Sequence, residues 1–301
     1  SASTFLNSGT INISGSTSAA GGSRSSAIGV IEDSTLTGGS SVRGHTGVVK
    51  NTSTGIINVS GGKGNTGIFL KVASPDDIIN DGIINVSGEK NSAMRVDNGV
   101  VAADVAGSPK VINSATGTIN INDSDNFGGI AADGDGTNRA EAINNGAIII
   151  ENKGLAGTFI ENTVGMVSIK AGVSAASGGY IENNGMILMQ NDIKTSQGMA
   201  VLGSSEGLNT GNIIINSSTL GESSVGVYNE GTFRMTGGLV DVASPKGIGI
   251  YAKNSSAVTN VTGGTIRVSN GAIGLYADDK ANLGSGATIG LSGGAKLEVN
   301  S

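Results

Sequence analysis

A short strand-like motif recurs along the whole chain and constrains the fold more than any other feature of the sequence. In this motif a glycine is followed by apolar residues two and four positions later, as in Gly55-Ile-Ile57-Asn-Val59. Further copies begin at Gly9, Gly82, Gly117, Gly146, Gly165, Gly185, Gly211, Gly231 and Gly264. Alternating apolar positions give a β-strand one buried face, because successive side chains point to opposite sides. Recurrence of one such strand is typical of a solenoid rather than of a compact domain.

A second motif lies between copies of the first and gives the length of one repeat. It consists of an apolar residue, a glycine, an apolar residue and a tyrosine, and its C-terminal copies end at Tyr228, Tyr251 and Tyr276. Related segments without tyrosine occur at 46–49 and 66–69. The tyrosines are 23 and 25 residues apart, which we interpret as the length of one coil.

Glycine pairs at 237–238, 263–264 and 293–294 separate strand-like segments within the C-terminal repeats. Each repeat is therefore expected to hold three short strands joined at glycine-rich corners. We predict an all-β chain in which residues 1–301 form one right-handed parallel β-helix of about twelve coils, in a rod of roughly 55 Å. A β-propeller needs about 40–45 residues per blade, and an antiparallel sandwich does not explain strands that recur in phase.

Asparagines occupy two kinds of position in these repeats. One kind lies between the two apolar residues of the strand, faces solvent and could form an amide ladder from coil to coil: Asn12, Asn58, Asn85 and Asn120. The other kind precedes the glycine of the strand motif. There we expect residues that tolerate positive φ at a tight corner: Asn144, Asn145 and Gly146, and likewise Asn183, Asn184 and Gly185.

Composition excludes several classes of protein. The 51 glycines show no triplet period, which excludes collagen, and an apolar fraction of 37% argues against disorder. The net charge is −6 with no cluster of basic residues, so we predict no nucleic-acid partner. No apolar run approaches the roughly 18 residues that span a bilayer, so we expect no direct membrane insertion by this segment. The absence of cysteine excludes disulfides and thiol chemistry.

Large aliphatic residues replace the solvent-facing asparagine in the middle of the chain. We expect Ile149, Leu188 and Ile214 to point outward, with Ser168 at the same position of its own strand. Contiguous exposed apolar residues often mark a site of partner contact. The alternative is that a longer loop covers them.

Two further outward groups are candidates near the C-terminus. Tyr228, Tyr251 and Tyr276 are expected to form an aromatic ladder, which could hold a sugar or could be plain β-helix construction. Asp241, Arg267 and Glu298 are expected to form a self-neutralising column that fixes the register of the coils.

Sites of chemistry are sparse in this sequence. The single histidine, His45, has no Gly-x-Ser-x-Gly motif beside it, and its pairing with Asp76 and Asp77 resembles polysaccharide hydrolases only faintly. We therefore predict that the chain is not an enzyme and needs no cofactor. Oxygen ligands for a Ca²⁺ ion could come from one acidic loop, although its spacing is not that of an EF-hand. Its candidate ligands are Asp123, Asp125, Asp133 and Asp135.

The Gly-Thr-Ile-Asn-Ile strand, the Asn-Asn-Gly corner and the Ile-Gly-Ile-Tyr-Ala strand resemble the passenger domains of type V autotransporters of Gram-negative bacteria. The pattern is most similar to large fusobacterial outer-membrane adhesins. The resemblance implies a cell-surface passenger segment of a longer protein that a C-terminal β-barrel anchors in the outer membrane. It also implies adhesion, with a host-cell receptor or glycan, or a surface protein of another bacterium, as partner. A purely structural stalk and, more remotely, a polysaccharide-processing enzyme are the alternatives.

Overall fold

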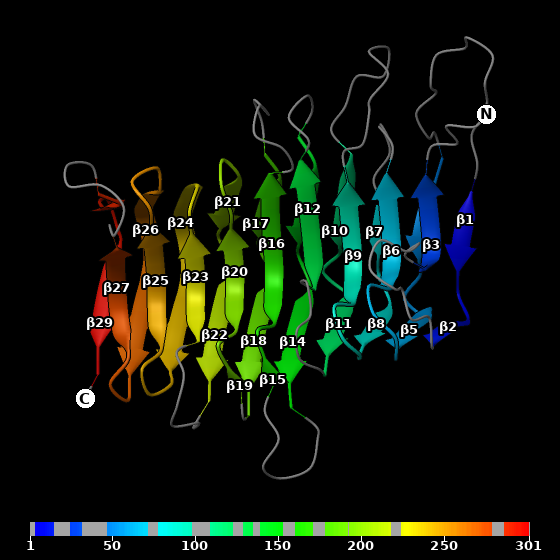
Figure 1. Ribbon diagram of the computed structural model, residues 1–301, viewed down its shortest axis with the longest axis horizontal. Coiled ribbons are helices and arrows are strands. Elements are labelled where there is room, and N and C mark those ends of the chain that lie inside the picture. Colours follow the sequence, from blue (N-terminus) through cyan, green and yellow to red (C-terminus); the bar gives the residue numbers. More distant parts are fainter. Residues whose placement is uncertain are drawn as a thin grey trace.

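The computed structural model describes residues 4–14, 25–31, 47–71, 78–97, 109–122, 129–134, 139–152, 160–170, 178–191, 193–217, 224–278 and 286–300. Within these residues every element is a β-strand, and every strand pairs in parallel with strands of neighbouring coils. The strands stack side by side along one elongated body, with the N-terminal strands at one end and the C-terminal strands at the other (Figure 1). The predicted right-handed parallel β-helix is therefore confirmed.

Three strand ladders form the long faces of the rod. The first ladder comprises β1 (Phe5–Asn7), β4 (Val49–Asn51), β7 (Ile78–Asn80), β10 (Lys110–Asn113), β13 (Glu141–Asn144), β17 (Tyr180–Asn183), β21 (Glu206–Asn209), the first parts of β24 (Thr232–Ala243) and β26 (Val258–Ser269), and β28 (Thr288–Leu291).

The second ladder comprises β2 (Thr10–Ser14), β5 (Ile56–Ser60), β8 (Ile83–Val86), β11 (Thr118–Ile121), β14 (Ala147–Glu151), β18 (Met186–Gln190), β22 (Asn212–Asn216), the second parts of β24 and β26, and β29 (Lys296–Val299). β24 and β26 run through both ladders, which makes them one 18-stranded sheet. The corner between the two ladders holds Gly238 and Gly264 with φ of 73° and 85°, as the glycine pairs predict.

The third ladder is a separate nine-stranded sheet. It comprises β3 (Ser26–Ile31), β6 (Thr66–Lys71), β9 (Ser92–Asp97), β12 (Ile130–Gly134), β16 (Val164–Lys170), β20 (Gln197–Val201), β23 (Val225–Asn229), β25 (Ile248–Lys253) and β27 (Ile273–Asp278). Two short strands, β15 (Ile160–Glu161) and β19 (Ile193–Lys194), pair with each other at the corner that precedes it.

The described residues make ten coils rather than about twelve, since the 18 strands include two that serve both ladders and so give ten strand segments in each. The estimate from the C-terminal repeats was too high because earlier coils are longer. Successive coils are 44, 29, 33, 31, 39 and 26 residues long where one buried asparagine marks each of them. The strands of successive coils stay in register in spite of these differences in length.

A continuous apolar core fills the rod, built from the inward residues of all three ladders. Seven asparagines at the end of first-ladder strands also point inward and are 0–7% exposed: Asn7, Asn51, Asn80, Asn113, Asn144, Asn183 and Asn209. The side-chain amides of the first six each donate a hydrogen bond of 2.7–2.8 Å to the amide oxygen of the next asparagine along the rod. We call this the buried amide ladder.

The predicted role of the Asn-Asn-Gly corners is wrong. None of Asn144, Asn145 and Gly146 has a positive φ, and the same holds for Asn183, Asn184 and Gly185. The first asparagine is selected instead for the buried amide ladder, where it satisfies polar atoms that would otherwise be buried without partners. The glycine is selected because a Cβ at Gly146 would collide with the carbonyl oxygen of Gly117 in the preceding coil.

The glycine of the second motif lies at or just before the start of most third-ladder strands, whereas β3 and β9 have Ala27 and Ala93 at this position. A Cβ built on Gly249 would lie 2.5 Å from the carbonyl oxygen of Gly274 and 3.0 Å from Cγ2 of Ile266 in the core. Both Gly249 and Ile250 therefore face the interior, and the next residue, Tyr251, faces out. The same offset places Ser168 in the wall of the core with no exposed surface, so its predicted outward position is wrong.

Candidate functional site

One column of outward side chains runs along the whole second ladder, and its side chains are first amides, then aliphatic, then charged. Its members pair in register from coil to coil: Asn12, Asn58, Asn85, Asn120, Ile149, Leu188, Ile214, Asp241, Arg267 and Glu298. We call it the outer column. It contains the three groups that the sequence predicts to face solvent on this strand, now placed on a single face.

The asparagines of the outer column form the predicted exposed amide ladder. The side-chain amides of Asn58, Asn85 and Asn120 each donate to the amide oxygen of the asparagine one coil earlier, over 2.7, 2.8 and 2.9 Å. These bonds hold the side chains in one orientation, so this part of the face is flat and polar.

The aliphatic strip, which consists of Ile149, Leu188 and Ile214, follows directly in the next three coils. All three side chains are half-buried, so they are neither fully exposed to solvent nor completely covered by other residues. Two positions earlier in the strands, Ala147 and Met186 extend the apolar surface sideways, whereas the exposed Asn212 in the third strand separates them from Leu239 in the next coil. The opposite flank is polar, with Glu151 paired in register to Gln190. The result is an apolar patch with a polar rim.

The charged end of the outer column is a chain of ion pairs. The Nη1 atom of Arg267 lies 3.5 Å from a carboxylate oxygen of Asp241, and its Nε lies 2.9 Å from one of Glu298. The predicted self-neutralising column is confirmed. Both carboxylates are one coil away from the arginine, so the three charges cancel to −1 over this part of the face.

The three tyrosines lie on the third ladder, on a different face from the aliphatic strip. Tyr228, Tyr251 and Tyr276 pair in register as predicted. Their rings meet edge to face, with centroids 5.4 and 5.1 Å apart and interplanar angles of 90° and 67°. The rings therefore do not present one continuous aromatic surface to a sugar.

Carboxylates engage the hydroxyl groups of two of these tyrosines. The Tyr228 hydroxyl donates to Glu230 over 2.7 Å, and the Tyr251 hydroxyl donates to Asp278 over 2.9 Å. Burial, together with the hydrogen bond and negative charge of Asp278, raises the pKa of Tyr251 to about 12. Burial also raises the pKa of Tyr228, against the effect of the nearby Lys253. Tyr276 is the most open of the three, at 41% exposure.

Only one of the four predicted calcium ligands, Asp133, lies among the described residues. Asp133 forms an ion pair with Arg95, with 2.7 Å between Oδ2 and Nη2, and Arg95 also lies 3.1 Å from Asp97. A guanidinium in this position neutralises the carboxylate that the ion would need. Asp123, Asp125 and Asp135 lie outside the described residues, as do His45, Asp76 and Asp77. Among the residues that are described, no group of three or more acidic, histidine or cysteine side chains could hold a metal ion.

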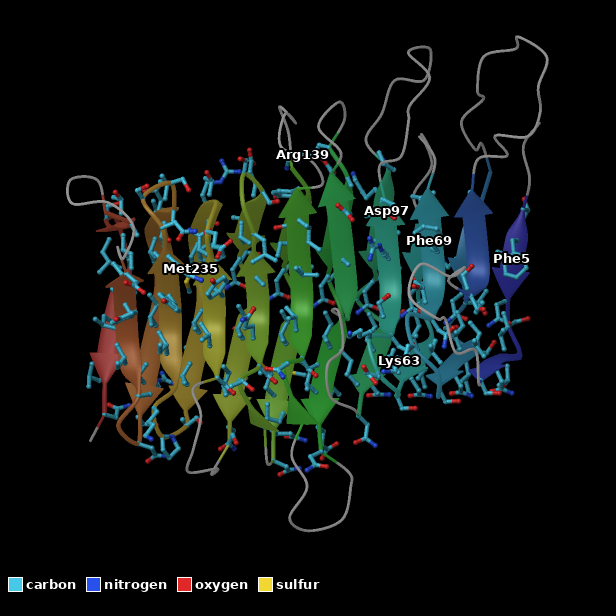
Figure 2. All side chains as sticks on the ribbon, viewed as in Figure 1. Phe5, Lys63, Phe69, Asp97, Arg139 and Met235 are labelled. Carbon is cyan, nitrogen blue, oxygen red and sulfur yellow. The ribbon has the colours of Figure 1, made fainter. Side chains whose placement is uncertain are left out.

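Sequence reasoning missed two features of the outer surface. Ala131, Val167 and Ala200 point outward from the third ladder but are 0–3% exposed, and they form a second small apolar cluster. The signal for it is the loss of apolar–polar alternation in β12, β16 and β20. Arg139, at the upper edge of the rod in Figure 2, lies 3.7 Å above the ring of Tyr180 and donates to Glu206 over 3.1 Å.

Comparison with known proteins leaves the family open: no family model matches the chain, and neither curated proteins nor solved structures give a significant match. Within the described part of the chain, no helix is both long and apolar enough to cross a membrane.

Proposed function

We propose that this chain is a rigid segment of a secreted bacterial adhesin, displayed at the surface of the outer membrane, and that the aliphatic strip is its contact site. The observation that carries the proposal is the outer column, in which three half-exposed aliphatic side chains interrupt amides on one side and ion pairs on the other. A column that served only to hold coils in register would have no use for them, because hydrogen-bonded asparagines do this in the preceding coils.

The shape of the molecule supports this proposal. Every coil hydrogen-bonds to the next through its backbone, and the core and the buried amide ladder run through most coils. A stack held by such nearest-neighbour contacts is a stiff rod that presents long flat faces. The resemblance to autotransporter passenger domains points to the same role. The partner is a host-cell receptor or glycan, or a surface protein of another bacterium.

A structural stalk is the second candidate, and the unbroken register of the first and second ladders favours it. In that case the rod positions a binding site that lies elsewhere on a longer polypeptide. The two candidates differ in what they predict for surface substitutions: a stalk tolerates a charge anywhere on its outer faces, whereas a contact site does not tolerate it within the aliphatic strip.

Attachment assays with single variants separate these candidates. Beads that carry the 301-residue chain would be tested for attachment to host cells and to bacteria, with Leu188→Asp, Ile214→Asp and Tyr251→Ala compared with the unchanged chain. Asn12→Asp is the matched control, because it adds the same charge to the same column in the first coil, far from the aliphatic strip. We expect the two aspartate variants within the strip to lose attachment while the control keeps it. Equal attachment by all variants would leave the stalk as the better account.

A further inference from the structure

We propose that the aliphatic strip binds a second copy of this chain, face to face, about a two-fold axis that passes through Leu188 and runs along the strands. The inference rests on the proposed role of the strip as a contact site and names its partner. In this arrangement the two rods lie side by side with opposite coil order, so that the N-terminal coils of one copy meet the C-terminal coils of the other.

Two symmetric arrangements place the rods parallel with their second-ladder faces together, because the two-fold axis then lies between the faces and runs either along the rod or along the strands. If it runs along the rod, each coil meets the same coil of the second copy. Asp241, Arg267 and Glu298 then each face their own copies, and three like-charge pairs oppose binding. If the axis runs along the strands, coil order is reversed and none of these residues meets itself. The charges therefore select the second arrangement.

In the reversed order, each residue of the outer column faces a compatible residue of the second copy: aliphatic residues face aliphatic residues, and charged residues face amides. With Leu188 on the axis, Ile149 meets Ile214 of the second copy, which buries the aliphatic strip against itself. One coil further out, Asn120 meets Asp241. Beyond that, Asn85 meets Arg267. Each charged residue thus faces an amide, which donates to carboxylates and accepts from guanidinium groups.

The flanking positions agree with the same axis. Met186 meets Met186, Ala147 meets Asn212 and Leu239 meets Thr118 of the second copy, so uncharged side chains face one another beside the aliphatic strip. On the polar flank Gln190 meets itself, and Glu151 meets Asn216 rather than another acid. No pair of like charges arises in these columns, although the sequence has no internal symmetry that would require this.

The area of the face fits a reversible dimer. Seven coils, from Asn85 to Arg267, at about 4.8 Å each and five residues per strand at about 3.3 Å give roughly 550 Å² per copy. The total of about 1,100 Å² lies at the lower end of specific protein–protein interfaces. We therefore expect a dimer whose population depends on concentration, as suits contact between rods on opposing cells.

Sedimentation of the 301-residue chain over a range of concentrations tests the proposal directly. We expect a monomer–dimer equilibrium that Leu188→Asp weakens by about tenfold or more, while Tyr251→Ala, on another face, leaves it unchanged. Asn120→Asp should also weaken it, because the new carboxylate meets Asp241 of the second copy. Adding Asp241→Asn to that variant exchanges the two side chains and should restore the dimer.

Cross-linking tests the axis even where a charged variant fails to fold. Sheets pack about 10 Å apart, which is too far for a direct disulfide, so single cysteines would be joined by a short bismaleimide; the chain has no cysteine of its own. Asn85→Cys mixed with Arg267→Cys should cross-link, and neither should alone, because each lies six coils from its own copy. Cross-linking of each alone would overturn the reversed order.

The remaining outcomes separate this inference from the proposed function. A chain that stays monomeric at all concentrations, yet attaches to cells that lack it through the aliphatic strip, overturns the dimer and leaves the adhesin. A dimer that is insensitive to both Leu188→Asp and Asn120→Asp uses another surface and overturns the inference. Attachment that needs the chain on both surfaces, and that Leu188→Asp on either surface weakens, supports it.

Discussion

Asn209 and Met235 occupy the same inward position in two successive coils, and the buried amide ladder ends between them. From Asn7 to Asn209 this position is an asparagine that bonds to its neighbours, whereas Met235 and then Val261 place apolar side chains there. At this inward position the rod is thus built in two ways, with a line of amides in its N-terminal seven coils and apolar side chains in the two coils that follow. Figure 2 shows Met235 within the C-terminal half.

Replacement of Asn113 by alanine should destabilise the rod by about 1–3 kcal/mol, because it leaves buried amide atoms of its neighbours without partners. Asn113 accepts a hydrogen bond from Asn80 and donates one to Asn144, all without exposed surface. Asn85→Ala in the exposed amide ladder is the control and should cost no more than about 0.5 kcal/mol. Hydrogen exchange resolved by coil is the appropriate measurement, and equal protection in the two variants would contradict the prediction.

Alanine at Gly249 should destabilise the C-terminal coils by about 1–3 kcal/mol or more, because its Cβ would overlap the backbone of the next coil and the side chain of Ile266. Gly9→Ala is the matched control, since nothing lies within 4 Å of a Cβ built there. Urea denaturation, followed by circular dichroism, would show a lower midpoint for Gly249→Ala and an unchanged midpoint for Gly9→Ala. An unchanged midpoint for both would mean that the coils can separate at little cost.

Arg95 should matter more for stability than Arg267, although each forms ion pairs with two carboxylates. The Arg95 side chain is 9% exposed, so Arg95→Leu leaves Asp133 and Asp97 nearly buried without their guanidinium partner, at a cost of about 3 kcal/mol. Arg267 lies in solvent, and Arg267→Leu should leave the denaturation midpoint unchanged. A larger loss of stability from Arg267→Leu than from Arg95→Leu would contradict this prediction.

Alkaline pH should weaken the C-terminal coils through Tyr251. Its pKa is raised to about 12, so the folded chain holds this proton more tightly than the unfolded chain, whose tyrosine titrates near about 10. The stability that this gives is complete below about pH 10 and is lost as the pH rises through about 12. Burial also raises the pKa of Tyr180 and of Tyr228, so absorbance of the phenolate should show a late-titrating signal that Tyr251→Phe reduces by one tyrosine. An identical late signal in the unchanged chain and in Tyr251→Phe would contradict the hydrogen bond from Tyr251 to Asp278.

The sequence predicts the ladders and the outward positions well because period-two alternation and register repeat in every coil. The outer column, the tyrosine ladder and the double-glycine corners all follow from this. The position of Ser168 could not be predicted, since Met166 and Val167 are both apolar and alternation alone does not say which faces in. The buried amide ladder was missed because an asparagine before a glycine is equally typical of a turn, and only contacts between coils distinguish the two.

The separation of strands from corners has a consequence for how such a chain can change over generations. Coils of 26 and of 44 residues, counted between successive buried asparagines, both keep the ladder of asparagines in register. A substitution in the outer column changes the surface of a single coil, about 4.8 Å along one face, and leaves the core unchanged. The rod can therefore diversify what it shows to its surroundings one coil at a time, while the frame that carries these changes stays the same.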